Sequence, residues 1–359
     1  MKTKNQATGW AGVALALIAA LVLGGCEKPD SVQRGYRGTG MSQLYNPDTL
    51  SAAASLHAVP DPEPTDPPDP EAPAIKDVFK NVTVLNDLTV LEFSRLMQAL
   101  STWVAPVEGC EFCHNPNKLE SDEKYAKVVA RRMLQMTRQI NTEWKSHVAG
   151  TGVTCWTCHR GQAVPSGDWF ASPVEGNAFG MLGRRDGQNQ AGVQTVGNAS
   201  LPVDPLSKYL VDDSLIRVQG TSALADGTGN SVKSAEWTYA LMIYMSKSLG
   251  VNCSFCHNTR ALARWDESSP QRSTAWYGIR MVRSLNTEYL NPIKPLLPSH
   301  RLSAQGDGPK VGCETCHKGA YKPLYGAPML ADYPELAGVM KDRPPAVAAA
   351  PVAASAAKN

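Results

Sequence analysis

The sequence predicts a mainly α-helical chain with extensive loops, built from two similar halves. Apolar residues recur every three or four positions in several stretches, which is the spacing of one helix face. The 29 glycines and 26 prolines among 359 residues predict long connections between these helices. Short segments also recur in the same order in residues 76–165 and 233–323, which indicates an internal duplication.

Eight of the nine cysteines fall into four copies of the pattern Cys-x-x-Cys-His, the signature of c-type haem attachment. One helical turn places positions i, i+3 and i+4 on one face, so two thiols can form thioethers while the histidine ligates iron. A disulfide or a zinc site would not require histidine at that offset four times. We therefore predict four covalently bound haems. The motifs are Cys110-Glu-Phe-Cys113-His114, Cys155-Trp-Thr-Cys158-His159, Cys253-Ser-Phe-Cys256-His257 and Cys313-Glu-Thr-Cys316-His317.

The duplication places two motifs in each half. Phe112–Asn115 recurs as Phe255–Asn258, and Asn141–Glu143 recurs with the same three residue types as Asn286–Glu288. Each half then has the order helix, haem, helix, haem. The fold class expected from this order is a multihaem cytochrome c, mainly α, with two pseudo-symmetric helix–haem–helix–haem halves.

The N-terminus has the features of a secretory signal. Lys2 and Lys4 precede an apolar run from Ala11 to Leu23, and Gly24-Gly25 stands before Cys26. This arrangement predicts a bacterial lipoprotein whose Cys26 is acylated. The alternative is an uncleaved membrane-spanning helix, for which the apolar run is short. Either reading places the body of the protein outside the cytoplasm and near a membrane.

Segments of biased composition mark the boundaries in the rest of the chain. A proline-rich acidic spacer follows the leader, a glycine-rich linker separates the halves, and an alanine- and proline-rich tail ends the chain. The expected divisions are a signal peptide at 1–25, an anchor and spacer at 26–75, the first dihaem half at 76–165, the linker at 166–232, the second dihaem half at 233–323 and the C-terminal tail at 324–359.

The histidine count limits how the four irons can be ligated. The chain has seven histidines, and only His57, His147 and His300 lie outside the motifs. Four haems with two histidines each are therefore excluded. Methionine is the natural substitute for a missing histidine, and ligation by its thioether sulfur raises the reduction potential.

The helices that precede the first and third motifs each carry a matched methionine. A helix capped at Asn86–Asp87 is expected to run to about Val104, with Met97 on its apolar stripe. The aligned helix of the second half ends at Gly250 and carries Met242 at the same position. Met97 and Met242 are therefore the ligand candidates for these two irons.

The helix before the second motif is ambiguous. It is expected from about Asp122 and carries both Met133 and Met136 on one stripe. The duplicate places Gly278 opposite Met133 and Met281 opposite Met136. If Met136 is the ligand, Met281 should serve the fourth iron. If Met133 is, the fourth iron has no local methionine and must take His147 or His300, and the residues leave both readings open.

These motifs, the leader and the methionine-bearing helices resemble the tetrahaem cytochrome subunit of purple-bacterial photosynthetic reaction centres. The resemblance extends to about Leu330 and includes residues 35–38 and 201–205. It implies that three haems have histidine–methionine ligation and that the fourth has two histidines. The implied sixth ligands are Met97, Met133 and Met242, with His147 crossing to the fourth iron; Met136 and Met281 are then core residues.

The resemblance also implies a function. The protein would lie on the periplasmic face of the membrane against the L and M subunits, without enzymatic activity. It would take electrons from a soluble cytochrome c or a high-potential iron–sulfur protein and re-reduce the photo-oxidised bacteriochlorophyll pair. The alternatives are a multihaem enzyme, which needs an open iron position, and an electron conduit without a reaction centre. A net charge of +2 with no basic stripe gives no indication of nucleic-acid binding.

Acidic residues surround the first motif and predict long-range attraction of a basic donor. Such attraction should weaken as the salt concentration rises. The residues are Glu108, Glu111, Glu120, Asp122 and Glu123, with Lys118 and Lys124 among them.

Overall fold

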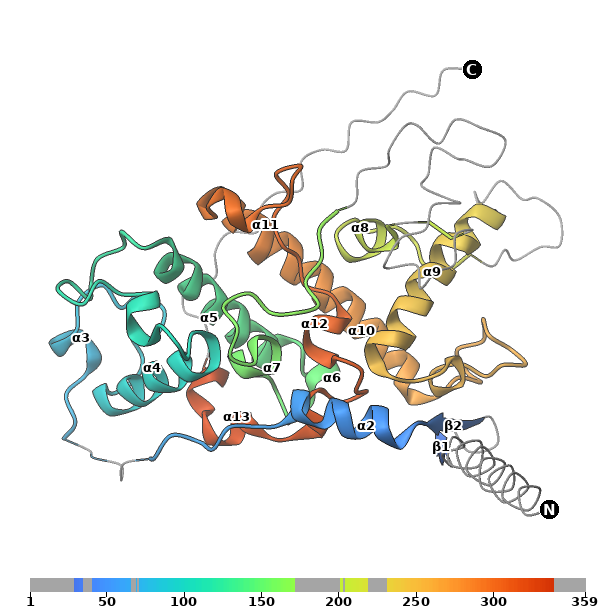
Figure 1. Cartoon of the computed structure of the whole chain (residues 1–359), viewed down its shortest axis with the longest axis horizontal. Helices are drawn as coiled ribbons and strands as arrows, with labels where there is room; N and C mark the ends of the chain where they lie inside the picture. Colours follow the sequence, from blue (N-terminus) through green and yellow to red (C-terminus); the bar gives the residue numbers. More distant parts are fainter. Residues whose placement is uncertain are drawn as a thin grey trace, which may run out of the picture.

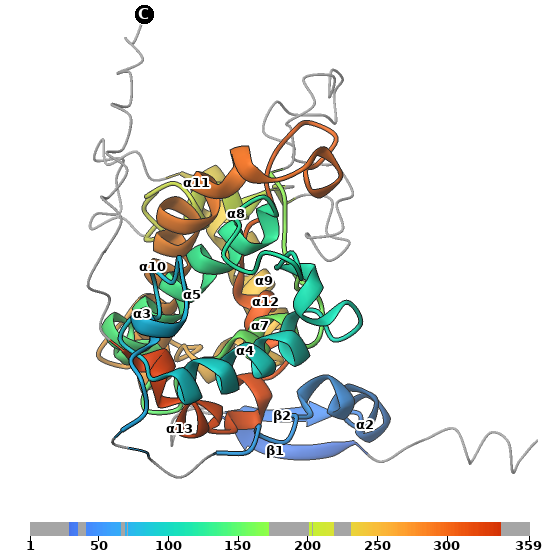
Figure 2. The ribbon, with the colours of Figure 1, turned by 90° about the vertical axis from the view of Figure 1, so that its left-hand side faces the viewer.

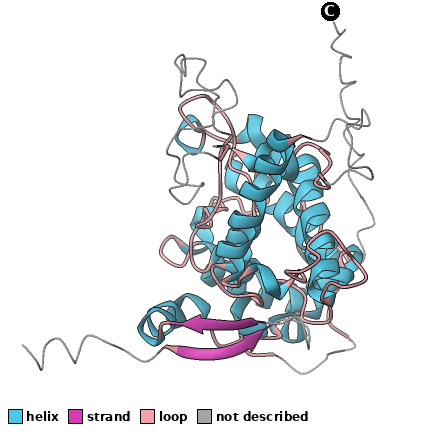
Figure 3. Cartoon of the chain, turned by 90° about the vertical axis from the view of Figure 1, so that its right-hand side faces the viewer, coloured by secondary structure: helices cyan, strands magenta, loops and turns pink. Residues whose placement is uncertain are grey.

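The computed structural model describes residues 29–34, 41–65, 69, 71–171, 201–202, 204–218 and 231–338. Helices dominate this part of the chain, and its one sheet is an antiparallel hairpin of β1 (Asp30–Arg34) and β2 (Met41–Tyr45) (Figure 3). The prediction of a mainly helical chain is confirmed. The predicted lipid anchor Cys26 and the end of the predicted tail lie outside the described residues.

The first half is built around two long helices, α4 and α5, and the second half around α9 and α10 (Figure 1). None of the helices within the described ranges is long and apolar enough to cross a membrane. The helices before the linker are α2 (Pro47–Ala54), α3 (Ile75–Val78), α4 (Val90–Val104), α5 (Tyr125–Glu143), α6 (Lys145–Val148) and α7 (Cys155–His159). The later helices are α8 (Pro205–Leu210), α9 (Val232–Leu249), α10 (Pro270–Ser284), α11 (Asn291–Ile293), α12 (Cys313–His317) and α13 (Met329–Asp332).

Helix α4 begins later than predicted. Thr89 is its cap: the Thr89 hydroxyl accepts from the Glu92 amide at 3.3 Å, and the Glu92 carboxylate accepts from the Thr89 amide at 2.8 Å. This reciprocal pair is a capping box. The predicted cap at Asn86–Asp87 is wrong because the Asp87 carboxylate is bound by the Arg138 guanidinium of α5, at 2.9 and 3.1 Å.

Helix α9 ends where predicted, at Gly250. Its cap at the other end is Ser231, whose hydroxyl accepts from the Ser234 amide at 3.2 Å. Gly250 has a φ of +63°, and a β-carbon there would collide with the backbone of Gly319 just after the fourth motif. Glycine is therefore required on two grounds, left-handed backbone and close approach.

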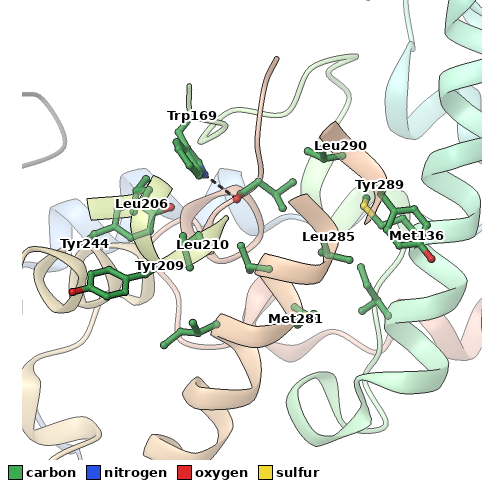
Figure 4. Close-up of a cluster of buried hydrophobic side chains, with 14 of the residues drawn as sticks. Met136, Trp169, Leu206, Tyr209, Leu210, Tyr244, Met281, Leu285, Tyr289 and Leu290 are labelled. Carbon is green, nitrogen blue, oxygen red and sulfur yellow. Dashed lines mark hydrogen bonds between the residues drawn. The ribbon is translucent and has the colours of Figure 1, made fainter. Parts of the chain in front are cut away.

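Two apolar clusters hold the elements together. One gathers around α8, α9 and α10 and also takes Met136 and Ile140 from α5, so it joins the two halves (Figure 4). In it, the Trp169 indole donates to the Val311 carbonyl at 2.9 Å. The other cluster packs residues of the first half against the segment after the fourth motif, and in it the Trp103 ring meets the Tyr333 ring edge-on at 4.6 Å.

Residues predicted as linker and tail also contribute to these clusters. Leu206, Tyr209 and Leu210 of α8 are buried in the cluster that joins the halves. The segment containing α13 and the following turn η9 (Pro334–Ala337) returns to pack on α5. Figure 2 shows α13 beneath α4, on the side of the molecule that also carries the β1–β2 hairpin. The division into domains stays a prediction.

Candidate haem-attachment sites

Each of the four motifs forms one helical turn, as the spacing predicts. The second and fourth motifs are α7 and α12. The first and third lie on short 3-10 turns, η2 (Gly109–Phe112) and η4 (Cys253–Phe255). In both of these, the histidine amide donates back to the first cysteine carbonyl, from His114 at 2.9 Å and from His257 at 3.0 Å. None of the eight motif cysteines is in a disulfide.

The four motif histidines share one orientation. In each, ring nitrogen Nδ1 lies 2.8–2.9 Å from a backbone carbonyl oxygen a few residues ahead. An Nδ1–H that donates to a carbonyl leaves Nε2 with its lone pair free for a metal. The carbonyl partners are Leu119 for His114, Gln162 for His159, Leu262 for His257 and Ala320 for His317.

Burial favours the neutral, metal-ligating form in three of these rings. It lowers the pKa of His317 to about 4, and it also lowers the pKa values of His159 and His257. A neutral imidazole with one nitrogen held by a carbonyl suits an iron ligand.

His147 lies against the fourth motif, although it belongs to the first half. Its ring centroid is 6.1 Å from that of His317, and its Nδ1 lies 2.9 Å from the Thr274 carbonyl oxygen. A metal at about 2 Å from one nitrogen of each ring separates the nitrogens by about 4 Å. The ring radii account for the rest of the centroid distance, so the pair fits a single iron.

Gly278 makes the approach of His147 possible. A β-carbon on Gly278 would lie 2.5 Å from His147 Cε1 and 2.8 Å from Nδ1, closer than such atoms approach. Gly278 occupies the position that aligns with Met133. The His147 ring therefore fills the space that a methionine side chain from α10 would enter.

The five methionines considered as ligands fall into two groups that differ in solvent exposure. Met136 and Met281 lie in the cluster that joins the halves, with exposed fractions of 9% and 6%, as expected for core residues. Met97, Met133 and Met242 are less buried and pack at cluster edges. A side chain at an edge can present its sulfur to a bound group; the assignment of these three methionines as ligands stays a prediction.

The second and fourth motifs meet in the middle of the molecule (Figure 1). The Arg160 guanidinium, directly after the second motif, donates to the Cys316 carbonyl of the fourth motif at 2.9 Å. Helices α4 and α9, which lead to the first and third motifs, lie on opposite sides of this contact. His300 is exposed.

Two asparagines that position the motifs were not predicted. Asn141 donates to the Val153 carbonyl at 2.9 Å and accepts from the Val153 amide at 2.7 Å. Asn286 makes the same pair with Val311, at 3.0 and 2.9 Å. Val153 and Val311 each lie two residues before a motif. These amides therefore link α5, and the helical segment η5 (Leu285–Leu290) that continues α10, to α7 and α12. The repeated Asn-Thr-Glu was visible in the sequence, but this role was not.

The chain is similar to proteins of one kind along most of its length. A family model described as photosynthetic reaction centre cytochrome C subunit matches residues 25–337. A photosynthetic reaction center cytochrome c subunit of Rubrivivax gelatinosus is 50% identical over 343 residues, 95% of this chain and 92% of that protein. That of Thermochromatium tepidum is 47% identical over 90% of this chain and 79% of its own length, and that of Roseobacter denitrificans is 42% identical over 92% and 91%.

Proposed function

The chain belongs to the family of photosynthetic reaction centre cytochrome c subunits, and from this we propose that it passes electrons through four covalently attached haems. As a member, it is an electron carrier of photosynthesis and not an enzyme, its cofactor is haem c, and its partners include the reaction centre. The proposal adds the number of haems, their ligands and the two ends of the route. A soluble periplasmic carrier would deliver electrons, and the photo-oxidised bacteriochlorophyll pair would receive them.

The observation that carries the proposal is the recurrence of one ligand geometry at all four motifs. The eight motif cysteines would hold the haems through thioethers, and the four motif histidines would ligate iron through Nε2. Bound haem supplies an iron that gains and loses one electron reversibly. The carbonyl that accepts from each Nδ1 would hold the imidazole in one orientation in both oxidation states of the iron. Little rearrangement would therefore accompany electron transfer.

The sixth ligands would make the four sites unequal. Met97, Met133 and Met242 would each supply a thioether sulfur, which raises the reduction potential relative to imidazole. His147 would supply the second imidazole at the fourth site, which is supported by its position between Gly278 and His317. Since every iron would then have a protein ligand at its sixth position, no site would admit a substrate to iron.

We propose the periplasmic face of the membrane as the location, with a lipid on Cys26 and contacts to the L and M subunits. The leader supports this placement. A soluble cytochrome c or a high-potential iron–sulfur protein would be the donor. Near the first motif, Glu108 and Glu111 are exposed, whereas Asp122 is paired with Arg131 at 2.7 Å. Glu108 and Glu111 would therefore contribute to the predicted attraction for a basic donor.

Flash spectroscopy on membranes containing the native complex tests the proposal. A flash should oxidise a haem of this chain as the bacteriochlorophyll pair is re-reduced, and the added donor should then restore the haem. Haem extraction as the pyridine complex should give four haems per chain, none of them released by acid acetone. A flash that leaves the haem spectrum unchanged, or fewer than four haems, would contradict it.

A further inference from the structure

Lys127, near the start of α5, is buried against the turn that follows the first motif. Only 8% of the residue is exposed. Its ammonium donates to the Leu119 carbonyl at 2.7 Å and to the Ser121 carbonyl at 3.0 Å. The same Leu119 oxygen lies 2.9 Å from His114 Nδ1. One carbonyl thus accepts both from the proposed iron ligand and from a buried cation.

The carboxylate that pairs with this ammonium is shared with an arginine. Asp122 Oδ1 lies 3.4 Å from Lys127 Nζ, but Arg131 already binds both oxygens of that carboxylate, at 2.7 and 2.8 Å. The Lys124 ammonium donates to a different carbonyl, that of Glu111. The Leu119 carbonyl therefore accepts from a buried ammonium whose paired carboxylate is shared with Arg131.

The second half has the histidine contact without the cation on its carbonyl. Aligning the two Asn-Thr-Glu segments places Arg272 opposite Lys127. Leu262 O lies 2.9 Å from His257 Nδ1, as at the first motif. The Arg272 guanidinium instead donates to the Arg264 carbonyl at 2.8 Å, and no side-chain donor within the described ranges reaches Leu262 O.

A second hydrogen-bond donor to a carbonyl oxygen weakens the hydrogen bond that the first donor makes. The oxygen has two lone pairs, and the charge-assisted bond from an ammonium is the stronger of the two. A weaker Nδ1–H···O bond makes the imidazole less basic. A less basic ligand stabilises the oxidised iron less, so the reduction potential rises.

We propose that Lys127 is a positioning residue that raises the reduction potential of the haem at the first motif by sharing the Leu119 carbonyl with His114. This inference rests on the haem attachment proposed above for that motif. It predicts that the first and third haems, alike in motif and in proposed methionine ligand, differ in how strongly their histidines are hydrogen-bonded.

Spectroelectrochemical titration of the purified complex compares Lys127→Met with Arg272→Met. Each variant removes one cation at the aligned position. Only Lys127→Met also removes a hydrogen bond to the carbonyl oxygen that the motif histidine contacts. We expect Lys127→Met to lower the reduction equilibrium constant of one haem about tenfold, or about 59 mV for a one-electron couple. We expect Arg272→Met to change its haem less than about threefold. Met97→His, which replaces the proposed ligand, identifies which of the titrating haems belongs to the first motif.

Lys127→Arg keeps the charge and should return the potential to within about threefold of the parent. Lys127→Gln keeps a neutral donor and should give an intermediate value, so it serves if the methionine variant does not fold. An unchanged potential in Lys127→Met or Lys127→Gln would overturn the inference, as would equal shifts in Lys127→Met and Arg272→Met. Haem content per chain, measured on the same samples, separates this result from a failure of haem attachment.

Discussion

The two halves share one framework and differ most at a single position of their second helices. In α5 this position is Met133, and in α10 it is Gly278, against which the His147 ring packs. The framework around it is the same in both, with an asparagine holding the segment before the motif. The difference shows how a duplicated chain can make two sites unequal: one side chain is lost, and a histidine from the other half takes its space.

His147→Met should give the largest effect, because it would replace the second imidazole at the fourth site by a thioether. We expect the potential of that haem to rise by on the order of 0.1 V, a fraction of the ~0.8 V that axial ligands span. Potentiometric titration measures the change, with Met136→Leu as the control in which no potential moves. A fourth haem that keeps its parent potential would rule out His147 as its ligand.

Gly278→Ala tests the same contact from the opposite side. The added carbon would lie 2.5 Å from the His147 ring, so the ring must shift, at a cost of about 1–3 kcal/mol. We expect carbon monoxide to bind one of the four reduced haems in this variant and none in the parent. Gly150→Ala is the matched control, since a β-carbon there meets nothing within 4 Å. Equal carbon monoxide binding in the two variants would count against the contact.

The asparagines test what the halves have in common. Asn286→Ala leaves the Val311 amide and carbonyl without these partners inside the protein, and Asn141→Ala does the same at Val153. We expect each to lower the free energy of unfolding by about 3 kcal/mol. Denaturation of the haem-loaded protein, followed by circular dichroism, measures it. The exposed Asn291→Ala should change the free energy by less than about 0.5 kcal/mol. Unequal losses for the two buried asparagines would mean that the framework is not shared.

Surface charge should give the smallest effect. Glu108 and Glu111 lie beside the first motif, whereas the aligned residues of the second half are uncharged. Glu108→Gln combined with Glu111→Gln should slow electron delivery by a basic donor a few-fold at low salt and not at all at high salt. Flash-induced haem re-reduction measures the rate. A decrease that persists at high salt would point to a contact other than long-range attraction.

The sequence was sufficient for features that depend on neighbours along the chain. Motif spacing predicted the four turns, and the duplication placed Gly278 opposite Met133. Caps were less predictable, because Asp87 binds Arg138 from a distant helix and leaves the capping of α4 to Thr89. The approach of His147 to α10 could be expected only through the family resemblance. Its hydrogen-bond partner there, Thr274, is 127 residues away, and only tertiary packing brings them together.

The most direct test of the central claim counts sulfur-ligated irons in the fully oxidised protein. A ferric haem with a methionine ligand shows a weak sulfur-to-iron charge-transfer absorbance in the far red that a haem with two histidines lacks. We predict this absorbance for three of the four haems, and for all four in His147→Met. Four sulfur-ligated haems in the parent, or a count that His147→Met leaves unchanged, would contradict the claim that His147 crosses between the halves to the fourth iron.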